Sequence, residues 1–404
     1  MSAAPLRVLC LDIEGGFGGS SRSLYESLRF IDRSKIAPEV WCHRDGPIRA
    51  RYEALDIPCR IVSGMPTMNS LQYASRNLFG YAVLLWKFMF WGKERFELVH
   101  ALRQRFDLVH FNHEGLFCLA DWLRGRHNKA QVTHVRTMIL DNVFGRWESR
   151  RLIAANDRLV FITENERDNV ERLGSRSANG TVIYNIAEPP PAALVVPAAI
   201  PNDGRLKVAV LSNYAFIRGV DRIVEIAQVL AARNRRDLLF VIAGSMKLAG
   251  SLPGELGEIA RAGGTLADYA AARGVADMML FLGHVAEPET VLTACDVLLK
   301  PTRDNNPWGR DILEALAAGK PVVSIGRYAR FVETEKTGIL LEHYSADAVA
   351  KILLRFDADR DLCLRLGANA AQRAEELCNG AARASDLLAV WQEAIAGRLK
   401  GMNT

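Results

Sequence analysis

The chain has 404 residues, which is too long for one hydrophobic core, so it should divide into two or three domains, with two large ones as the simplest arrangement. Its composition, 49% apolar and 24% charged, is typical of a globular protein without low-complexity blocks. The net charge of +5 is modest, and no Lys/Arg cluster is interleaved with aromatic residues, which disfavours nucleic acid as a partner.

The chain opens with a short apolar run, residues 7–13, which we interpret as a first β-strand. With Asp12 and Glu14 at its end, the run is too short and too acidic for a signal peptide. The seven cysteines are scattered, with no Cys-x-x-Cys pair and no histidine-rich neighbour at metal spacing. This pattern argues against a zinc site and a disulfide framework, and it fits a reducing cytoplasm.

Short apolar runs alternate with amphipathic segments of helical length along the whole chain. Strands that are apolar on both faces and alternate with helices are typical of parallel sheets covered on each side. The strands expected in the first half are residues 7–13, 39–42, 60–62, 107–112, 131–135, 158–163 and 181–185. Those expected in the second half are residues 206–212, 238–244, 279–283, 296–301 and 321–326. The pattern predicts an α/β protein with two Rossmann-like, doubly wound sheets.

A proline-rich segment, residues 188–204, is the best candidate for a linker between two domains. Its five prolines exclude a regular helix or a central strand. We therefore expect one domain over residues 1–187 and another over residues 205–384. The stretch from about 359 to 400 has a helical pattern throughout. We expect its last part, about 385–404, to cross back onto the first domain.

A glycine-rich loop follows the first expected strand. Ligands bind beyond the carboxyl ends of strands in parallel sheets, which makes Gly15, Gly16 and Gly18 candidates for binding. The next segment is helical, with Ser20 or Ser21 as its N-cap, and a helix N-terminus favours an anion or an acceptor hydroxyl. A purely structural tight turn remains open. The loop lacks the strict Gly-x-Gly-x-x-Gly pattern, which disfavours NAD.

Residues 78–91, LFGYAVLLWKFMFW, contain 12 apolar positions out of 14. A helix needs about 20 residues to span a bilayer, so this one is too short. A helix rich in Trp and Phe with basic flanks can instead lie in the headgroup layer. The basic residues in or around it are Arg76, Lys87, Lys93 and Arg95. Peripheral membrane contact through residues 76–95 and a buried core or oligomer helix both remain open.

The basic excess of the chain lies in its first half. Residues 1–200 carry 26 Lys and Arg against 21 Asp and Glu, whereas residues 201–404 carry 25 of each. Attraction to an anionic surface such as lipid headgroups would explain this bias, and so would ordinary surface solvation.

Titratable side chains gather at the ends of two expected strands of the first half. His110 and His113 lie at the end of one, and His134 and Arg136 at the end of the next. A lone histidine is usually a core group, but several at neighbouring strand tips converge on one crevice. We therefore expect these four residues at a substrate site.

In the second half, Ser212, Asn213 and Arg218 connect the first strand to its helix. Arg218, beside a helix N-terminus, can hold a diphosphate through two parallel hydrogen bonds. A solvent-exposed arginine is the alternative. Gly244 and His284 follow the next two expected strands, which adds them to the candidate site.

The most specific pattern runs from Lys300 to Glu314. An expected strand enters a polar loop that is followed by a helix, whose free N–H groups point back at the loop. Glu314 lies in the first turns of that helix, where it can accept hydrogen bonds from ribose hydroxyls. The other candidate residues here are Lys300, Arg303, Asn306, Pro307, Trp308, Gly309 and Arg310.

These motifs resemble the large group of retaining glycosyltransferases called family four, which have the GT-B architecture of two Rossmann-like domains facing across a cleft. The strongest match covers residues 206–342. The first half matches more loosely, through the glycine-rich loop and His134, which stands at the position of the histidine in the family's Thr-x-His pattern. The resemblance implies that the first domain binds a glycan or lipid-linked acceptor and that the second binds a nucleotide diphosphate sugar.

The resemblance also assigns roles in the donor site. Glu314 matches the second glutamate of the family's Glu-x7-Glu pattern, which binds the nucleotide ribose, while the first falls on Asn306, an uncharged residue that still forms hydrogen bonds. Arg218 stands at the family's usual lysine, but its usual arginine falls on Ser212. Lys300, Arg303 or Arg310 could supply the missing charge.

Enzymes of this type need no metal, because helix dipoles and basic side chains neutralise the departing diphosphate. Asp-x-Asp occurs only at residues 357–361, outside the candidate strand-end loops. By the same resemblance, His134 and the backbone amides near Gly16 and Gly309 would contact the reacting sugar. Similar bacterial enzymes approach lipid-linked acceptors on the cytoplasmic membrane face and take part in cell-surface polysaccharide or glycolipid synthesis.

Two other functions fit the same pocket. A nucleotide-sugar epimerase with this fold would use the donor without an acceptor. The departures at Asn306 and Ser212 also permit a non-catalytic protein that binds sugar nucleotides.

Overall fold

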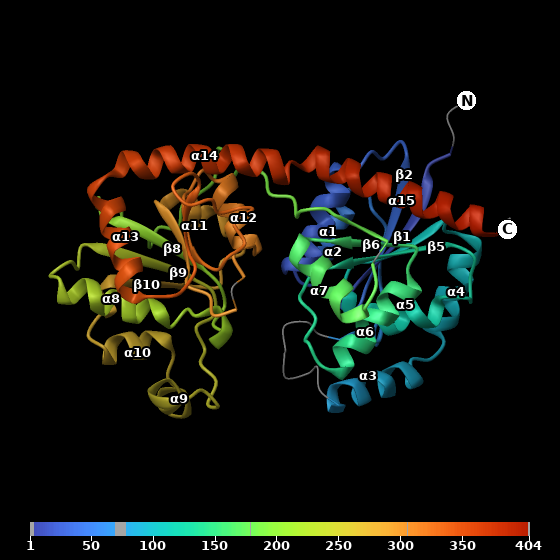
Figure 1. Cartoon of the computed structure of the whole chain (residues 1–404), viewed down its shortest axis with the longest axis horizontal. Helices are drawn as coiled ribbons and strands as arrows, with labels where there is room; N and C mark the ends of the chain where they lie inside the picture. The colour runs from blue at the N-terminus through green and yellow to red at the C-terminus, as the bar shows by residue number, and fades with distance from the viewer. Residues whose placement is uncertain (1–3, 69–77, 178, 305, 403–404) are drawn as a thin grey trace. The chain divides into compact units, whose positions relative to one another are not determined.

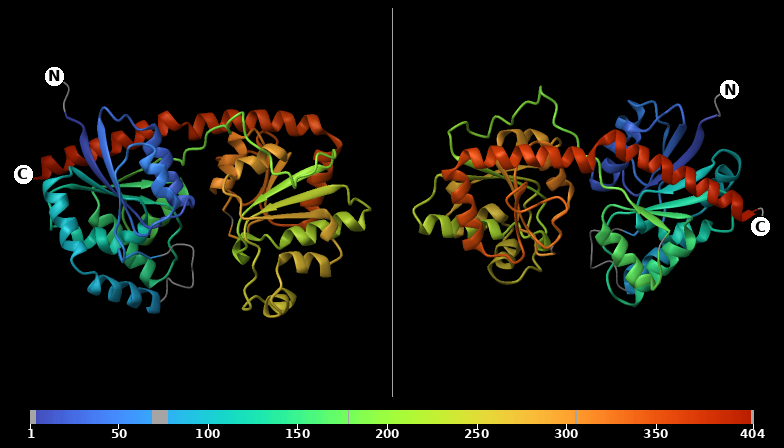
Figure 2. Two further views of the ribbon diagram at one scale, coloured as in Figure 1. Left: turned by 180° about the vertical axis from the view of Figure 1, so that it is seen from behind. Right: turned by 45° about the horizontal axis from the view of Figure 1, so that its top comes forward.

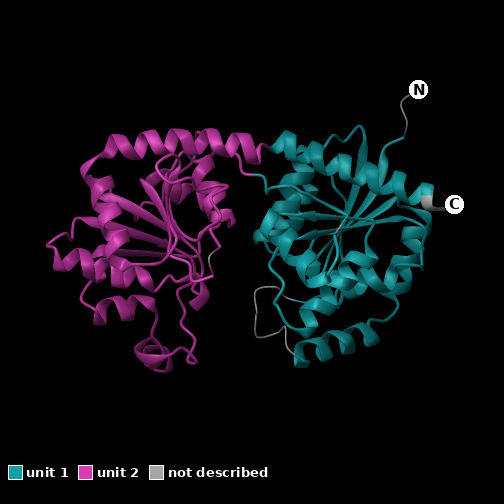
Figure 3. Cartoon of the chain, in the orientation of Figure 1, with its two compact units in different colours: residues 1–186, 380–404 teal, residues 187–379 magenta. Residues whose placement is uncertain are grey.

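The computed structural model describes residues 4–68, 78–177, 179–304 and 306–402. Arg76, part of the predicted membrane segment, lies outside these residues. The chain forms two compact units (Figures 1 and 3): unit 1 is Met1–Ile186 with Gly380–Thr404, and unit 2 is Ala187–Asn379. The segment 188–204 contains no helix or strand and belongs to unit 2 in this division.

Unit 1 contains a parallel seven-stranded sheet in the order β3-β2-β1-β4-β5-β6-β7. Its strands are β1 (Leu6–Asp12), β2 (Ile36–Cys42), β3 (Cys59–Ile61), β4 (Leu108–Phe111), β5 (Ala130–Val135), β6 (Arg158–Phe161) and β7 (Gly180–Val182). The inner strands are buried on both faces, as their continuous apolar runs predict.

The helices of unit 1 cover both faces of this sheet. They are α1 (Gly19–Phe30), α2 (Pro47–Glu53), α3 (Leu78–Phe90), α4 (Glu94–Gln104), the 3-10 turn η2 (Glu114–Leu116), α5 (Phe117–Leu123), α6 (Val143–Ala155), α7 (Glu164–Gly174) and α15 (Gly380–Met402). α1, α2 and α15 share one apolar core, whereas α3 to α7 belong to the cores on the other face.

The last helix completes the core of unit 1. Figure 2 shows α15 lying across one face of the seven-stranded sheet. Trp391 of this helix is fully buried against residues of β1, β4 and β5. Its indole N–H donates a hydrogen bond to His110 Nδ1 (3.2 Å). The two residues are 281 positions apart in the sequence.

Unit 2 contains a parallel six-stranded sheet in the order β10-β9-β8-β11-β12-β13. Its strands are β8 (Leu206–Leu211), β9 (Leu238–Ala243), β10 (Met279–Gly283), β11 (Val297–Lys300), β12 (Val322–Ile325) and β13 (Gly338–Leu341). The helices are η3 (Phe216–Arg218), α8 (Arg222–Ala232), α9 (Gly254–Arg261), α10 (Leu266–Ala272), η4 (Ala276–Met278), α11 (Glu289–Ala294), α12 (Arg310–Ala317), α13 (Ala346–Ala358) and α14 (Arg360–Cys378). The pattern analysis did not predict β13.

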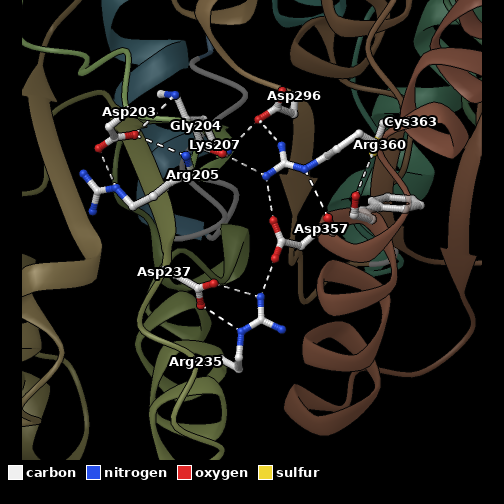
Figure 4. A network of polar contacts seen from close by, with 11 residues as sticks. Asp203, Gly204, Arg205, Lys207, Arg235, Asp237, Asp296, Asp357, Arg360 and Cys363 are labelled. Carbon is white, nitrogen blue, oxygen red and sulfur yellow. Dashed lines mark hydrogen bonds and ion pairs between the residues drawn. The ribbon is translucent and has the colours of Figure 1, made fainter.

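Ion pairs tie α13 and α14 to the strand beginnings of unit 2 (Figure 4). Arg360 pairs with Asp357 (2.6 Å) and with Asp296 (3.1 Å), which directly precedes β11. Arg235 contacts both Asp357 and Asp237, the residue before β9. These groups lie at the amino ends of the strands. Ligands bind at the carboxyl ends in this topology, so this ion-pair network is not part of the ligand site.

α3 lies on the outside of unit 1 (Figure 1), and only one narrow stripe of it is buried. Tyr81 and Leu84 are in the core, but Phe79, Trp86 and Phe90 are 77%, 58% and 65% exposed. The alternative of a buried core helix therefore applies only to this stripe. No helix in the described part of the chain combines the length and the apolarity needed to cross a membrane.

Candidate active site

In unit 2 the strand order changes direction between β8 and β11, which are neighbours in the sheet. Strand connections leave such a point toward opposite faces, and this opens a crevice at the carboxyl ends of the two strands. The loop after β8 carries Ser212, Asn213 and Arg218, and the loop after β11 carries the residues between Lys300 and α12. The two strongest motifs of this half therefore flank the same crevice.

Arg303 and Arg222 lock these two loops together. Arg303 donates to both carboxylate oxygens of Asp221 and to the Phe216 carbonyl (2.7 Å). Arg222 donates to the carbonyls of Pro301 (3.1 Å) and Thr302 (2.7 Å). Arg303 is thus occupied within the scaffold, and the prediction that it binds substrate is not supported by its position.

Gly219 allows the two loops to approach each other. Its φ is +67°, a left-handed conformation that favours glycine, and a Cβ here would lie 2.0 Å from the Pro301 carbonyl oxygen. Any side chain would push the loops apart. The glycine that follows Arg218 is therefore needed for the geometry of the crevice.

The basic residues around this crevice differ in their partners. Lys300 pairs with Asp311 (2.9 Å) and Arg310 with Glu314 (3.1 Å). Arg218 donates to the Ser212 hydroxyl (2.9 Å), and no carboxylate of the described residues lies within ion-pair distance of it. Of these cations, Arg218 has its charge available for an anionic ligand.

α12 begins at this crevice. Gly309 precedes it and provides no side chain to cap its N-terminus, so the partial positive charge of the helix faces the loop. Glu314 is buried to 7% exposure in the second turn. In the loop, Asn306 Oδ1 accepts a hydrogen bond from the Trp308 N–H (3.4 Å), and Trp308 packs edge-on against Tyr328. Pro307 is buried next to it.

The remaining residues predicted in unit 2 lie on the β9 side. Asn213 Oδ1 accepts from the Ser245 N–H (2.8 Å), and a Cβ at Gly244 would lie 2.3 Å from the Ser212 carbonyl oxygen. Both residues thus hold the start of the loop after β8. His284 is exposed at the end of β10, an edge strand two positions from β8, so the structure does not bring it to the crevice.

The first six strands of unit 1 follow the same order, with β7 added at the edge, and the change of direction lies between β1 and β4. The glycine-rich loop leaves β1 here, and a Cβ at Gly15 would lie 2.2 Å from the Arg44 carbonyl oxygen. A Cβ at Gly16 would meet only Gly18 N, at 4.0 Å, and one at Gly18 would approach Glu14 Oε2 at 2.9 Å. Close backbone packing thus requires glycine at position 15, while the space beside Gly16 is open.

The predicted N-cap of the first helix is wrong. α1 begins at Gly19, and its N-cap is Gly18, which has no side chain to accept a hydrogen bond. Ser20 and Ser21 lie inside the first turn instead. The uncapped N-terminus of α1 consequently faces the end of β1. In unit 2, the uncapped N-terminus of α12 faces the loop after β11 in the same way.

Buried polar side chains connect the ends of β1, β4 and β5. Asn112 donates to Asp12 Oδ1 (3.2 Å), and Arg136 donates to Asn112 Oδ1 from both Nε (3.1 Å) and Nη2 (2.6 Å). The backbone N–H of Arg136 donates to Glu114 Oε2 (2.9 Å). Burial raises the pKa of Asp12 to about 6, although the Ser21 and Asn112 side chains and the charge of Arg136 oppose this shift.

His134 belongs to this network. Arg136 Nη2 donates to its Nδ1 (3.2 Å), which requires the proton of the neutral ring to be on Nε2. Burial, and then the charge of Arg136, lowers the pKa of His134 well below its usual value, so the ring is neutral at physiological pH. Its Nε2 has no hydrogen-bond partner among the described residues. His134 therefore presents one buried, unused N–H donor.

His110 and His113 have structural partners. His110 lies within β4, not beyond its end, and is fully buried beside Trp391 on the face covered by α15. His113 accepts from the Gly115 N–H (2.9 Å) and thereby caps η2. Because Trp391 covers His110 and His113 caps η2, their positions argue against the direct substrate contacts predicted for them.

Pattern reasoning omitted Asp12, Asn112 and Glu114 from the site. Asp12 ends β1, Asn112 directly follows β4 and Glu114 lies two residues further along. All three are beside the change of strand direction, which is the signal that could have identified them. A buried carboxyl group with a raised pKa is also typical of functional sites.

Both halves of the chain match known families. Residues 198–373 match the model described as "Glycosyl transferases group 1", and residues 17–189 match "Glycosyltransferase Family 4". Two D-inositol 3-phosphate glycosyltransferases, from Streptomyces avermitilis and Streptomyces scabiei, are 34% identical over 114 residues, 27% of this chain. The match spans only about a quarter of these relatives, 24% and 25% of their lengths.

Solved structures agree in fold over nearly the whole chain. Anabaena HepE in complex with UDP has a TM-score of 0.72 at 18% identity, covering 96% of this chain and all of that one. Sucrose-phosphate synthase from Thermosynechococcus elongatus has a TM-score of 0.71 at 16% identity, covering 97% and 99%. With family matches in both halves and two Rossmann-like sheets, the chain belongs to the family four glycosyltransferases and has their GT-B fold.

Proposed function

We propose that this glycosyltransferase moves a sugar, with retention of configuration and without a metal, from a nucleotide diphosphate sugar to a glycan or lipid-linked acceptor. The reaction would serve cell-surface polysaccharide or glycolipid synthesis at the cytoplasmic membrane face. The observation that carries the proposal is Arg218, whose charge is not neutralised by a described carboxylate, at a crevice that also receives the uncapped N-terminus of α12.

In this proposal unit 2 binds the donor. Arg218 and the α12 N-terminus stabilise the negative charge that develops on the departing diphosphate. Glu314 accepts hydrogen bonds from the ribose, and Asn306 contacts the transferred sugar. The fold neighbour HepE was solved with UDP and with UDP-glucose, which supports uridine donors as the first to test.

Unit 1 would bind the acceptor beside the glycine-rich loop. The neutral His134 ring has an Nε2–H available to donate to a sugar oxygen, and Asp12 can accept from an acceptor hydroxyl. Neither group needs to act as a covalent nucleophile.

Thermal unfolding with UDP, GDP, ADP and CMP sugars tests the donor assignment. The matching donor, added at about a hundred times its Kd, should raise the free energy of unfolding of the protein by about 2.7 kcal/mol. We expect a UDP sugar to raise the midpoint of thermal unfolding. In a turnover assay with the same sugar, we expect the release of UDP to require an acceptor. Sugar isomerisation without acceptor would instead indicate an epimerase, and stabilisation without any turnover a binding protein. If no nucleotide sugar stabilises the chain, the proposal fails.

We also propose that α3 makes the membrane contact. Its exposed Trp86, Met89 and Phe90 lie beside exposed Lys87, and this combination suits the boundary between headgroups and acyl chains.

Flotation with liposomes tests the contact of α3. The wild type should float with anionic liposomes, and a Trp86→Glu/Phe90→Glu variant should remain in the dense fraction, because charged side chains cannot enter the apolar layer. Leu364→Glu changes a side chain of similar exposure (71%) on α14 and should float normally. Wild-type protein that stays at the bottom would contradict the contact.

A further inference from the structure

A surface groove lies between α6 and the end of α7 in unit 1. It has a volume of about 490 Å³ and is lined by Trp147, Arg150, Arg151, Ala154, Gly174 and Arg176. Gly174 brings the two helices close together, because a Cβ at this position would lie 2.5 Å from Ile153 Cδ1. Ser175 then adopts a left-handed conformation (φ +56°), which turns the chain toward Arg176.

Three guanidinium groups surround the groove with little opposing charge. Of the residues that the structure describes, none places a carboxylate within ion-pair distance of Arg150 or Arg176, and Arg151 contacts only Asp121, at 3.5 Å. By contrast, Arg146 on α6 and Arg172 on α7 both pair with Asp141. The groove therefore has an excess of positive charge that its neighbours on the same helices lack.

The groove is continuous with α3. Trp147, which forms part of its lining, contacts Tyr81 of α3 edge-on at 6.1 Å, and Tyr81 stacks on Phe144 at 4.8 Å. The Tyr81 hydroxyl donates to Glu148 (2.9 Å). These contacts hold α3 against α6, and Figure 1 shows the two helices side by side. The exposed apolar side chains of α3 and the arginines of the groove thus lie on adjoining elements.

We infer that this groove binds the phosphate of an anionic phospholipid headgroup while α3 rests among the acyl chains. Guanidinium groups form paired hydrogen bonds with phosphate oxygens, and Trp is favoured at the level of headgroups. The volume exceeds the roughly 30 Å³ share of one water many times and accommodates a headgroup. The inference rests on the proposed membrane contact of α3, and it adds a preference for anionic lipid.

Vesicle binding by an Arg150→Ala/Arg176→Ala variant tests the site. Each arginine near an anionic surface contributes about 1 kcal/mol, so we expect affinity for phosphatidylcholine vesicles containing phosphatidylglycerol to fall about 30-fold. Affinity for pure phosphatidylcholine should not change. The matched control is Arg146→Ala/Arg172→Ala, which removes the same charge from the same two helices but from residues paired with Asp141. It should lose less than about threefold.

An equal loss in both double variants would mean diffuse attraction and would overturn the site, as would unchanged binding of the groove variant. A second arm measures thermal unfolding with inorganic phosphate. If phosphate stabilises the wild type and not the groove variant, while vesicle binding is the same for both, the ligand is a free phosphate and the lipid assignment is wrong.

The α3 variant Trp86→Glu/Phe90→Glu separates this result from the proposed contact. Loss of binding to both kinds of vesicle in this variant, together with a loss restricted to anionic vesicles in the groove variant, supports both ideas. If the α3 variant binds normally and the groove variant does not, the α3 contact fails but the anionic site stands.

Discussion

Arg218→Ala is expected to weaken binding of the nucleotide sugar about 100-fold and to abolish its thermal stabilisation. The guanidinium has no described carboxylate to neutralise it, so in the complex its charge is directed to the diphosphate. A hydrogen bond to a charged group contributes about 1.5–3 kcal/mol, and its removal leaves the anion less compensated. Titration calorimetry with the donor found in the panel measures the loss.

Glu314→Gln should weaken the same donor by a smaller factor of about 10, since the amide keeps one acceptor for the ribose. Arg205→Ala is the control. Arg205 pairs with Asp203 (2.7 Å) just before β8, at the opposite edge of the sheet (Figure 4), and its removal should leave donor affinity unchanged. A variant at Arg218 that binds donor within about threefold of the wild type would place the diphosphate elsewhere.

Asp12→Asn is expected to stabilise the protein at neutral pH and to impair transfer. The pKa of Asp12 is raised by burial from 3.8 to about 6, so the folded state binds its proton more tightly than the unfolded state. The stability that Asp12 contributes therefore falls as pH rises from about 4 to about 6 and stays constant above that range. At pH above 7 the buried carboxylate costs about 3 kcal/mol, which asparagine avoids.

Urea unfolding as a function of pH measures this effect. The difference between Asp12→Asn and the wild type should approach about 3 kcal/mol at neutral pH and vanish below about pH 4. Asp168→Asn, which changes an exposed aspartate of unit 1, is the control for the substitution itself. A variant at Asp12 that is less stable than the wild type at neutral pH would contradict the assignment, and one that transfers sugar normally would remove Asp12 from the acceptor site.

Much of the fold follows from apolar runs that are buried on both faces. The limits of β8, β9 and β10 differ from the predicted ones by no more than one residue. Polar residues or glycine bound these runs except at the start of β10, which Met278 precedes. β13 (Gly338–Leu341) was missed, although it is no shorter than β3 (Cys59–Ile61), which was predicted. Only its pairing with β12 makes it a strand.

The candidate site was predictable in position but not in electrostatics. Strand ends identify the loops at Arg218 and Asn306, yet which cation is neutralised depends on contacts between distant residues, such as Arg303 with Asp221. Likewise, serine is a residue type favoured at N-caps, but the helix starts two residues before Ser21, and Ser21 is buried. His110 was assigned to a strand tip, but it lies within β4, just before the last residue Phe111, and packs against Trp391.

The packing of α15 on unit 1 affects the order in which the protein can mature. A chain synthesised from its N-terminus emerges with β1 to β7 long before Trp391, and until that residue arrives the sheet face around Cys10, His110 and Val132 lacks its cover. Unit 2, whose elements are contiguous in sequence, has all of its parts first. The unit made first is therefore the one that finishes folding last, and in the meantime its bare apolar face is a natural target for chaperones.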